Sequence, residues 1–461
     1  MKHLIRFLLS PKTIVLLLTA LAIAGVISTV VPQSGTTEPV FFAEWQAKNP
    51  LWCSLVKILR LDQIFTSWWF LLLVGLIACS LACSLYYQAK AVITNREPKP
   101  ANSSLPHTTV TLASTKTNMR AAIKKILAAN QYRIISTSIE GNRLIFGKNR
   151  LGRWGSVIFH LGLLCVIIAA LYNSVHRQRG FATLVEDKPF VANAENWLST
   201  ELGLLAPPYN LDLSLQLTNF KPEYWQNDQV KTMNSEVVIN NKNGSKTTLP
   251  ISVNKPARIN GVKLFLSGDY GYALDFILNK KSSNPILTHI LMDAQTQKTE
   301  PLTCEMNFPT TDYQLNIRFF PDLTKPSHFP TFPAVDLVIR EKGEPPQSGR
   351  LLLNQTSILN NYNTMTLNRV SYWSGVIFVK TYGLPLLYTG FALSIAGAFI
   401  LYTLPFKVAY FSIIEEENHL KLIISGRVKR YQALFVHELE DIAQKLNQEV
   451  GIHGDNATAH S

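Results

Sequence analysis

The sequence predicts an α-helical membrane protein with four transmembrane helices, a large β-rich, sandwich-like extracytoplasmic domain and a small cytoplasmic α+β module. The first observation is composition: 47% of the 461 residues are hydrophobic, 16% are charged, and the mean hydropathy is +0.10. The second is that apolar residues are concentrated in four separate runs. The third is a series of short alternating stretches between the last two runs, which is typical of β-strands. The composition excludes disordered and collagen-like chains.

Four apolar runs are long enough to cross a bilayer. They hold 18 to 23 residues each and contain no Asp, Glu, Lys or Arg: 14–31, 68–87, 154–172 and 382–404. At about 1.5 Å per residue, such a helix spans a hydrocarbon core of roughly 30 Å. Aromatic residues stand at or near both ends of the last three runs, as they do in interfacial belts. The first run follows a basic segment, so a signal peptide is the alternative. We favour a retained span, because Val30-Val31-Pro32 offers no good cleavage site.

Basic residues are concentrated in one loop between the spans. Residues 88–153 hold twelve Lys and Arg against two Glu, whereas 32–67 holds three of each sign and 173–381 holds twenty basic and eighteen acidic residues. The positive-inside rule therefore places 88–153, the N-terminus and the tail 405–461 in the cytoplasm. Segments 32–67 and 173–381 are then outside a cytoplasmic (inner) membrane. This topology accounts for the net charge of +13, and we expect no nucleic-acid partner.

The segments between the spans differ in their patterns. Residues 51–59 suit a short interfacial helix in the outer loop. The loop 88–153 predicts a small α+β module from two strands, a helix and a last strand at 108–113, 132–139, 118–130 and 143–147. The outer segment predicts a β-sandwich from alternating runs at 211–217, 236–240, 247–253, 263–266, 273–278, 314–319, 334–339 and 357–359. The tail predicts a β-hairpin followed by an amphipathic helix at 433–446.

One ionisable residue lies well inside a predicted span. His160 is six residues past Trp154, about 9 Å into the bilayer from the cytoplasmic side. Gly152, Ser156 and Leu164 share its helix face, and small residues let another helix or a flat cofactor approach closely. A neutral imidazole can bind iron, so haem docked between helices is one interpretation. A histidine hydrogen-bonded to a neighbouring helix is the other, and the residues alone leave both open.

No other group indicates catalysis or a metal centre, and no catalytic residue is assigned. The five cysteines have neither CxxC nor CxxCH spacing. Cys165, in the same span as His160, is either a soft ligand or a small apolar side chain. Cys53 and Cys304 are the outer cysteines, and a disulfide between them stays open. Four further histidines lack metal-ligand spacing and are expected to be solvated: His107, His176, His289 and His328.

Several short motifs occur in order along nearly the whole chain. They are VPQ at 31–33, SWWF at 67–70, GSVIFHLG at 155–162, VNKP at 253–256, NG at 260–261, DYG at 269–271, GVIFVKTYGLPLLYTG at 375–390 and SGR at 425–427. Together they resemble ResB-type cytochrome c biogenesis proteins of the System II pathway. One departure is KTYG at 380–383, where an Asp-Pro-Gly-like entry to the last span is expected, and it leaves that helix start uncertain.

The resemblance implies a role in transfer rather than an enzyme acting alone. A ResB-type protein is a subunit of a cytochrome c synthase complex that helps haem cross the membrane for covalent attachment to apocytochrome c. The implied partners are a ResC/CcsA-type membrane protein, apocytochrome c and a thiol-reducing thioredoxin-like protein. The tryptophan-rich motif of the ResC/CcsA-type protein is absent here. The resemblance also implies haem b in transit, bound with the partner, and His160 as its iron ligand.

A function from another class remains the alternative. It is a non-haem, membrane-anchored scaffold or receptor whose outer β-domain binds a ligand. It predicts that no haem accompanies the protein and that Gln can replace His160 without effect.

Overall fold

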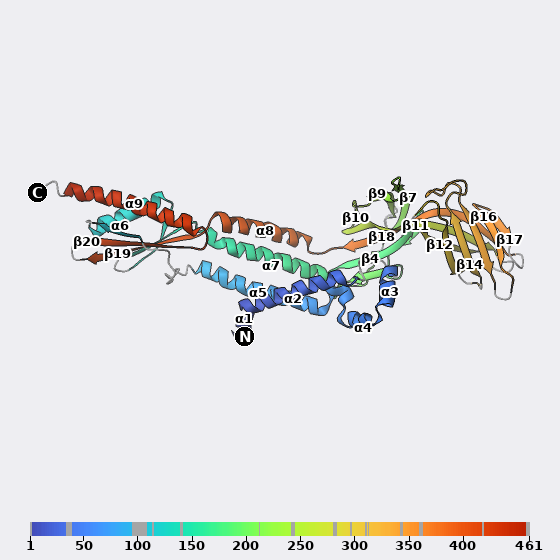
Figure 1. The fold of residues 1–461 in the computed structure, drawn as a ribbon, viewed down its shortest axis with the longest axis horizontal. Helices are drawn as coiled ribbons and strands as arrows, with labels where there is room; N and C mark the ends of the chain where they lie inside the picture. The colour runs from blue at the N-terminus through green and yellow to red at the C-terminus, as the bar shows by residue number, and fades with distance from the viewer. Residues whose placement is uncertain are drawn as a thin grey trace. The chain divides into compact units, whose positions relative to one another are not determined.

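A computed structural model of the chain describes residues 2–33, 39–94, 108–112, 115–138, 142–211, 213–240, 245–279, 284–295, 297–308, 311, 313–341, 344–358, 363–416 and 419–457. The chain divides into two compact units (Figure 1). The helical unit comprises Met1–Val30, Trp68–Tyr172 and Gly383–Ser461, and the β-rich unit comprises Val31–Ser67 and Asn173–Tyr382. His107 and the expected strand ends at residues 113, 139 and 359 lie outside the described residues.

Four described helices are long and apolar enough to cross a membrane, which confirms the predicted set. They are α2 (Pro11–Val30), α5 (Trp68–Ile93), α7 (Gly152–His176) and α8 (Leu384–Thr403). The helix α5 continues past the apolar run that predicts it, through Gln88 and Lys90. The helix α8 begins directly after Gly383, whose φ of 74° suits glycine, and Pro385 lies in its first turn.

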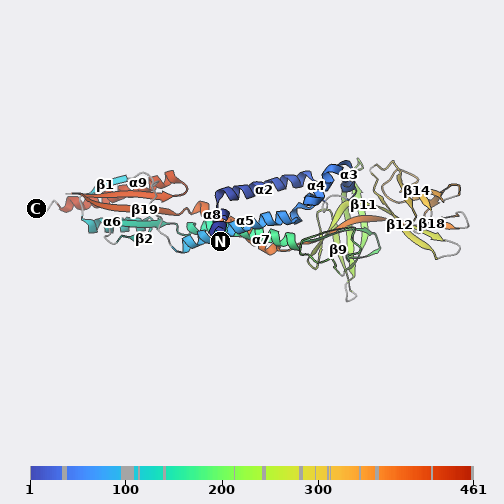
Figure 2. The ribbon, with the colours of Figure 1, turned by 90° about the horizontal axis from the view of Figure 1, so that it is seen from below.

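Small residues bring α7 and α8 together (Figures 1 and 2). A Cβ atom added at Gly155 would lie 2.7 Å from the backbone nitrogen of Leu401, and one at Gly162 would lie 2.4 Å from that of Ser394. Only glycine fits at such distances, so the two backbones are in direct contact. The helix α2 packs against α5, and the hydroxyl of Ser80 in α5 donates to the Leu8 carbonyl, 2.6 Å away, at the end of α1 (Lys2–Leu8).

The helical unit also contains a five-stranded antiparallel sheet covered by two helices. Its strands lie in the order β1-β20-β19-β3-β2. The elements of this α+β module are β1 (Thr108–Leu112), α6 (Lys116–Ala129), β2 (Arg133–Thr137), β3 (Arg143–Lys148), β19 (Lys407–Glu416), β20 (His419–Val428) and α9 (Gln432–Ala457). Ile123 and Leu439 of the two helices share one core with Phe146 and Phe411 of the sheet. The sequence predicts a loop module and a separate tail hairpin, whereas the structure joins them in one sheet.

The described part of the β-rich unit contains three antiparallel sheets over one hydrophobic core, in agreement with the predicted β-rich domain. The largest has the order β10-β11-β18-β4-β6, with β12 paired to β11 and β17 to β18. Its strands are β4 (Gln178–Val185), β6 (Ser199–Leu202), β10 (Ala257–Ile259), β11 (Val262–Asn279), β12 (Ile286–Asp293), β17 (Thr356–Ile358) and β18 (Thr364–Lys380). The long strands β11 and β18 pair with each other from Val262 to Asn279.

Two four-stranded sheets complete the unit, in the orders β13-β14-β15-β16 and β5-β7-β8-β9. Their strands are β5 (Pro189–Val191), β7 (Ser214–Tyr224), β8 (Val230–Asn240), β9 (Lys246–Ser252), β13 (Leu302–Asn307), β14 (Gln314–Phe320), β15 (Ala334–Arg340) and β16 (Gln347–Leu352). Buried and exposed side chains alternate along these strands, as the sequence pattern requires.

Three short helices precede the strands of the β-rich unit: α3 (Pro39–Lys48), α4 (Pro50–Leu59) and η1 (Leu61–Thr66). The helix α4 covers the segment predicted to be an interfacial helix. Val56 is buried, but most of its other apolar side chains are exposed, with Leu51 at 90% and Ile58 at 77%. That this face lies on the membrane stays a prediction.

Candidate functional site

His160 lies in the third turn of α7, about 12 Å along the helix from its first residue. The ring is half-buried, and its Nδ1 lies 2.6 Å from the backbone carbonyl oxygen of Ser156, one turn earlier. A carbonyl oxygen only accepts, so Nδ1 carries the proton and donates it. We assign this tautomer from the hydrogen-bond geometry.

In a neutral imidazole this tautomer leaves Nε2 with its lone pair. Within the described part of the chain Nε2 makes no hydrogen bond, because every hydrogen bond of His160 there is made by Nδ1. A neutral imidazole whose Nδ1–H is held by a carbonyl is the form in which histidine ligates metals. The bond to Ser156 also fixes the ring's orientation on the helix.

A chain of polar side chains connects His160 to α5. The Ser156 hydroxyl donates to Gln88 Oε1 at 2.8 Å, and Gln88 Nε2 donates to the Ser84 hydroxyl at 3.0 Å. The Ser156 hydroxyl is also 3.4 Å from Nδ1 of His160. These bonds tie α5 to α7 one turn before the histidine. Sequence reasoning missed Gln88, although a polar residue four positions after Ser84 at the end of an apolar run was the available signal.

The small residues of α7 that another helix approaches closely are its glycines. The sequence groups Gly152, Ser156 and His160 on one face for close approach of a helix or a flat molecule. In the structure the glycines at 155 and 162 face α8, and a Cβ atom at Gly152 would meet the Leu404 carbonyl at 1.8 Å. Ser156, one turn before His160, instead hydrogen-bonds to Gln88 of α5. The glycine side of α7 is therefore filled by α8.

The donor set around His160 fits one axial ligand of a haem iron. Among the described residues no group of three or more His, Cys, Asp and Glu could hold a metal ion. A haem iron already has four porphyrin nitrogens, so one protein imidazole with a free Nε2 supplies one axial position. Cys165 is a free, partly buried thiol further along α7.

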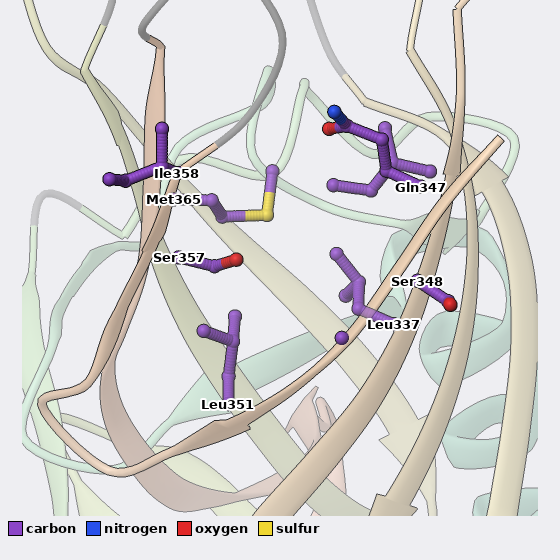
Figure 3. A pocket seen from close by; sticks show the side chains of 9 residues that line it. Leu337, Gln347, Ser348, Leu351, Ser357, Ile358 and Met365 are labelled. Carbon is purple, nitrogen blue, oxygen red and sulfur yellow. The ribbon is translucent and has the colours of Figure 1, made fainter. Parts of the chain in front are cut away.

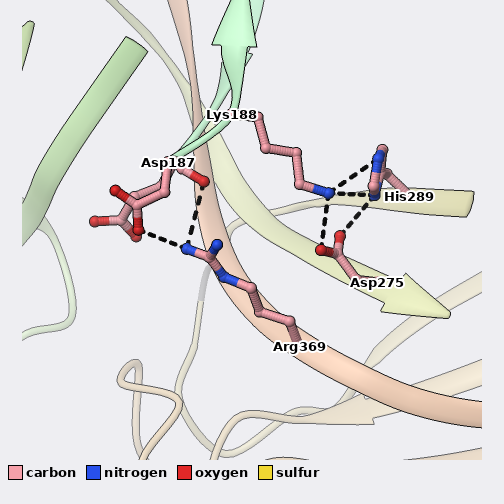
Figure 4. Close-up of polar contacts among 6 residues, drawn as sticks. Asp187, Lys188, Asp275, His289 and Arg369 are labelled. Atoms are coloured by element: carbon pink, nitrogen blue, oxygen red, sulfur yellow. Dashed lines mark hydrogen bonds and ion pairs between the residues drawn. The ribbon is translucent and has the colours of Figure 1, made fainter. Parts of the chain in front are cut away.

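The β-rich unit contains an acid–base cluster around one buried carboxylate, at the turn after β4 (Figure 4). Lys188 Nζ lies 2.8 Å from Asp275 Oδ2, and His289 Nδ1 lies 2.7 Å from Asp275 Oδ1. The Asp275 side chain is only 5% exposed. In the same turn Asp187 forms an ion pair with Arg369 of β18 at 2.7 Å. These contacts fasten the turn to β11, β12 and β18, which is a structural role.

His328 is buried, so the expectation of a solvated side chain was wrong for this residue. It is 4% exposed and stacks on Tyr224 with ring centroids 4.0 Å apart. Its carbonyl accepts a hydrogen bond of 2.6 Å from the Tyr272 hydroxyl, and its Nε2 lies 3.3 Å from Asp228 Oδ1. Burial raises the pKa of Asp228, but the neighbouring Lys298 and His328 outweigh it, so the pKa is lowered. His328 therefore anchors the loop between β14 and β15.

A cavity of about 240 Å³ opens between β15, β16, β17 and β18 (Figure 3). Leu337, Leu351 and Met365 form apolar walls, and Gln347 and Ser357 add polar atoms. None of the described side chains that line it is ionisable, and together they offer burial of apolar surface.

All five cysteines are free thiols, including the outer pair Cys53 and Cys304. Burial raises the pKa of the Cys304 thiol, and the neighbouring Glu305 raises it further. A raised pKa makes Cys304 a poor nucleophile. Cys304 is therefore not a candidate for a reactive thiol.

The chain is similar to proteins of known name over nearly its full length. A cytochrome c biogenesis protein CcsB from Prochlorococcus marinus is 25% identical, and the match covers 96% of this chain and 98% of the relative. A protein of the same name from Thermosynechococcus vestitus is 26% identical over 94% of this chain and 93% of its own length. The cytochrome c biogenesis protein Ccs1 of Guillardia theta is 22% identical over 96% and 100%.

A match to a family profile shows directly which family the chain belongs to. The profile described as the ResB-like family matches residues 12–440, which include α5, α7, α8, the β-rich unit and all but the first residue of α2. The motif around His160 lies inside this match. The chain therefore belongs to the ResB-like family.

Proposed function

We propose that this chain is a subunit of the machinery that matures c-type cytochromes, and that it holds haem b in transit across the cytoplasmic membrane. Membership of the ResB-like family and relatives named cytochrome c biogenesis proteins support this role. The observation that carries the haem assignment is the geometry of His160. Its Nδ1–H is held by the Ser156 carbonyl, and its Nε2 makes no hydrogen bond in the described residues.

In this proposal the residues of this chain bind and orient haem and make no covalent bond. His160 donates the Nε2 lone pair to the iron, and the carbonyl of Ser156 keeps the ring in the required tautomer. A ResC/CcsA-type partner supplies the second axial ligand and presents the haem. Attachment to apocytochrome c needs reduced thiols, which a thioredoxin-like protein maintains.

The charge distribution supports an orientation of the chain in the membrane. The loop 88–153 carries most of the net positive charge, so the α+β module belongs in the cytoplasm with both termini. The β-rich unit is then outside, where apocytochrome c and the partner are met. His160 then lies in the cytoplasmic half of the membrane, at the entry side of the path.

The test is the absorption spectrum of the chain co-purified with its membrane partners. We expect a haem spectrum for the wild type, a changed spectrum for His160→Ala and loss of c-type cytochromes from cells that carry this variant. His176→Ala is the matched control, because it removes an imidazole from the same helix α7 at its other end. It should leave both the spectrum and the cytochromes unchanged.

An unchanged spectrum and normal cytochrome maturation in His160→Ala would remove the ligand assignment. A wild-type complex that never carries haem would favour the alternative of a membrane-anchored scaffold. In that case the cavity beside Leu351 and Met365 is the first place to look for a ligand of the β-rich unit.

A further inference from the structure

A turn in the β-rich unit carries two exposed leucines at its tip. The amide of Ala206 donates to the carbonyl of Gly203 at 3.0 Å, so Leu204 and Leu205 are the two central residues of the turn. Leu204 is 59% exposed and Leu205 is 65% exposed. Gly, Pro, Asn, Asp and Ser are the usual residues of turns. Adjacent leucines at both central positions are therefore unusual for a turn that faces only water.

The direction of the chain brings this turn back towards the apolar helix α7. Strand β4 leaves the end of α7, and β6 runs antiparallel to β4. Beyond β6 the pairing continues, because the amide of Gly203 donates to the Arg177 carbonyl at 2.8 Å. The amide of Leu205 then donates to the Val175 carbonyl at 2.9 Å, inside the last turn of α7. The tip of the turn thus lies beside the end of the helix.

The position of Val175 sets the height of the two leucines relative to a membrane. The apolar run of α7 ends at Tyr172, an aromatic residue of the kind found at membrane interfaces. Val175 is three residues further, about 4.5 Å along the helix axis. The headgroup layer on each side of the hydrocarbon core is about 5–7 Å thick. The turn therefore lies at the height of the lipid headgroups.

Close packing and hydrogen bonds hold the turn in this position. A Cβ atom added at Gly203 would lie 2.4 Å from the carbonyl oxygen of Val175, so only glycine fits there. After the turn, the Pro207 carbonyl accepts a hydrogen bond of 3.0 Å from Gln178, which is 4% exposed. The side-chain oxygen of Gln178 accepts one of 3.1 Å from the hydroxyl of Tyr382. The turn is thus fastened to the residues that follow α7 and precede α8.

We propose that Leu204 and Leu205 insert into the lipid leaflet around the ends of α7 and α8, so that the turn seats the β-rich unit on the membrane surface. This inference goes beyond the proposed function, because it concerns lipid and not haem. Lipid is the partner that the fold favours, since the turn is hydrogen-bonded to the end of a helix that is long and apolar enough to cross a membrane. Apolar side chains at the boundary of headgroups and acyl chains anchor interfacial segments. A turn that is already held in place loses little conformational freedom on insertion.

The test introduces the photoreactive residue p-benzoylphenylalanine in place of Leu205 in the full-length protein. The protein is irradiated in bilayer discs of phosphatidylethanolamine and phosphatidylglycerol, and the mass of the peptide that carries the new residue is measured. Because a benzophenone adds to neighbouring C–H bonds, we expect a peptide whose mass has increased by that of one phospholipid. The same replacement of Leu204 is a second variant, which decides the question if the first one does not fold.

Leu198 is the matched control, since it is also a leucine and is 64% exposed. Its amide donates to the Phe181 carbonyl at 2.9 Å, next to the opposite end of β6. Phe181 is three residues along β4 from Gln178, roughly 10 Å further from α7 at about 3.3 Å per residue. The photoreactive residue at position 198 should give about tenfold less lipid adduct than at position 205, because it lies beyond the headgroup layer.

Each other outcome overturns the proposal. Thermal unfolding first identifies the variants that are folded. A folded variant with the photoreactive residue at the tip and no lipid adduct shows that the leucines do not reach the leaflet. Equal lipid adducts at positions 205 and 198 show that the height of the turn does not decide the contact. In native membranes, a cross-link from position 205 to another polypeptide in place of lipid would assign the turn to a protein interface. The haem spectrum of His160→Ala tests the proposed function separately from all of these results.

Discussion

At the scale of single residues, the sequence predicts the position of His160, the proposed iron ligand, but not the residues that surround it. His160 is recognisable because it is the one ionisable residue well inside an apolar run. Its bond to Ser156 follows from helix geometry, since that carbonyl lies one turn earlier. The contact with Gln88 joins residues 68 positions apart, and no local pattern reveals it. The same holds for Asp275 and Lys188, which are 87 positions apart.

The buried carboxylate of Asp275 gives a prediction at this scale. Asp275→Asn removes the charge that neutralises Lys188, which is 26% exposed, and we expect a loss of about 2–4 kcal/mol of unfolding free energy. The measurement is denaturant unfolding of the full chain followed by tryptophan fluorescence. Trp197 and Trp373, both buried in the β-rich unit, report on it.

Asp336→Asn is the control for this variant. It breaks the ion pair with Arg350, whose side chain is 50% exposed, and should change stability by less than about 1 kcal/mol. Equal losses for the two variants would show that burial of Asp275 does not set the strength of its pairing.

At the scale of elements, close packing decides how α7 and α8 meet. Apolar composition and length predict both helices, but they do not predict which helices touch. The glycines at 155, 162, 390 and 397 are the visible signal, and the structure pairs them across the two helices. The face of α7 that carries His160 is thereby left for α5.

Gly162→Ala tests this packing. The added methyl group would lie 2.4 Å from the Ser394 nitrogen and 2.6 Å from the Gly390 carbonyl oxygen, so the backbones have to separate. We expect a loss of about 1–3 kcal/mol, measured as helix unfolding by circular dichroism in a denaturing detergent. Gly75→Ala makes the same change in α5, where nothing lies within 4 Å, and should be neutral or slightly stabilising. Similar losses at both sites would contradict the proposed contact.

The helix α9 gives a pH-dependent prediction. Burial raises the pKa of Glu438, but hydrogen bonds from Lys148 and Lys407 outweigh it, so the folded-state pKa lies below the ordinary value of 4.5. A lowered pKa stabilises the fold fully above about pH 4.5, and this contribution is lost as the pH falls through the folded-state value.

Glu438→Gln should therefore destabilise the α+β module most at neutral pH, and the difference from the wild type should shrink below pH 4.5. Hydrogen exchange of the backbone of α9 in the full-length protein measures it, with Glu440→Gln, at an exposed position of the same helix, as the control. If the stability difference between Glu438→Gln and the wild type is the same from pH 7 to pH 3.5, the ion pairs of Glu438 are not the source of that difference.

At the scale of the whole molecule, the sequence predicts the fold class, but it does not predict how the strands of the α+β module come together. The apolar runs predict four helices, and the alternating segments predict a β-rich unit. Both signals are visible within each segment, because they depend only on residues close together in the sequence. The five-stranded sheet draws β1, β2 and β3 from one loop and β19 and β20 from the tail. Almost 260 residues separate β3 from β19, so the strand pairing could not be seen in either segment. This sheet joins the ends of α7 and α8, the helix pair on which the site is built.

The most direct measurement of the central claim is chemical rescue of the haem ligand. Replacement of His160 by glycine removes the imidazole from α7 and leaves room for a free one. We expect the purified complex of His160→Gly to lose the wild-type haem absorption and to regain it when imidazole is added. A His160→Gly complex with the wild-type spectrum in the absence of imidazole would contradict the claim that this side chain holds the iron.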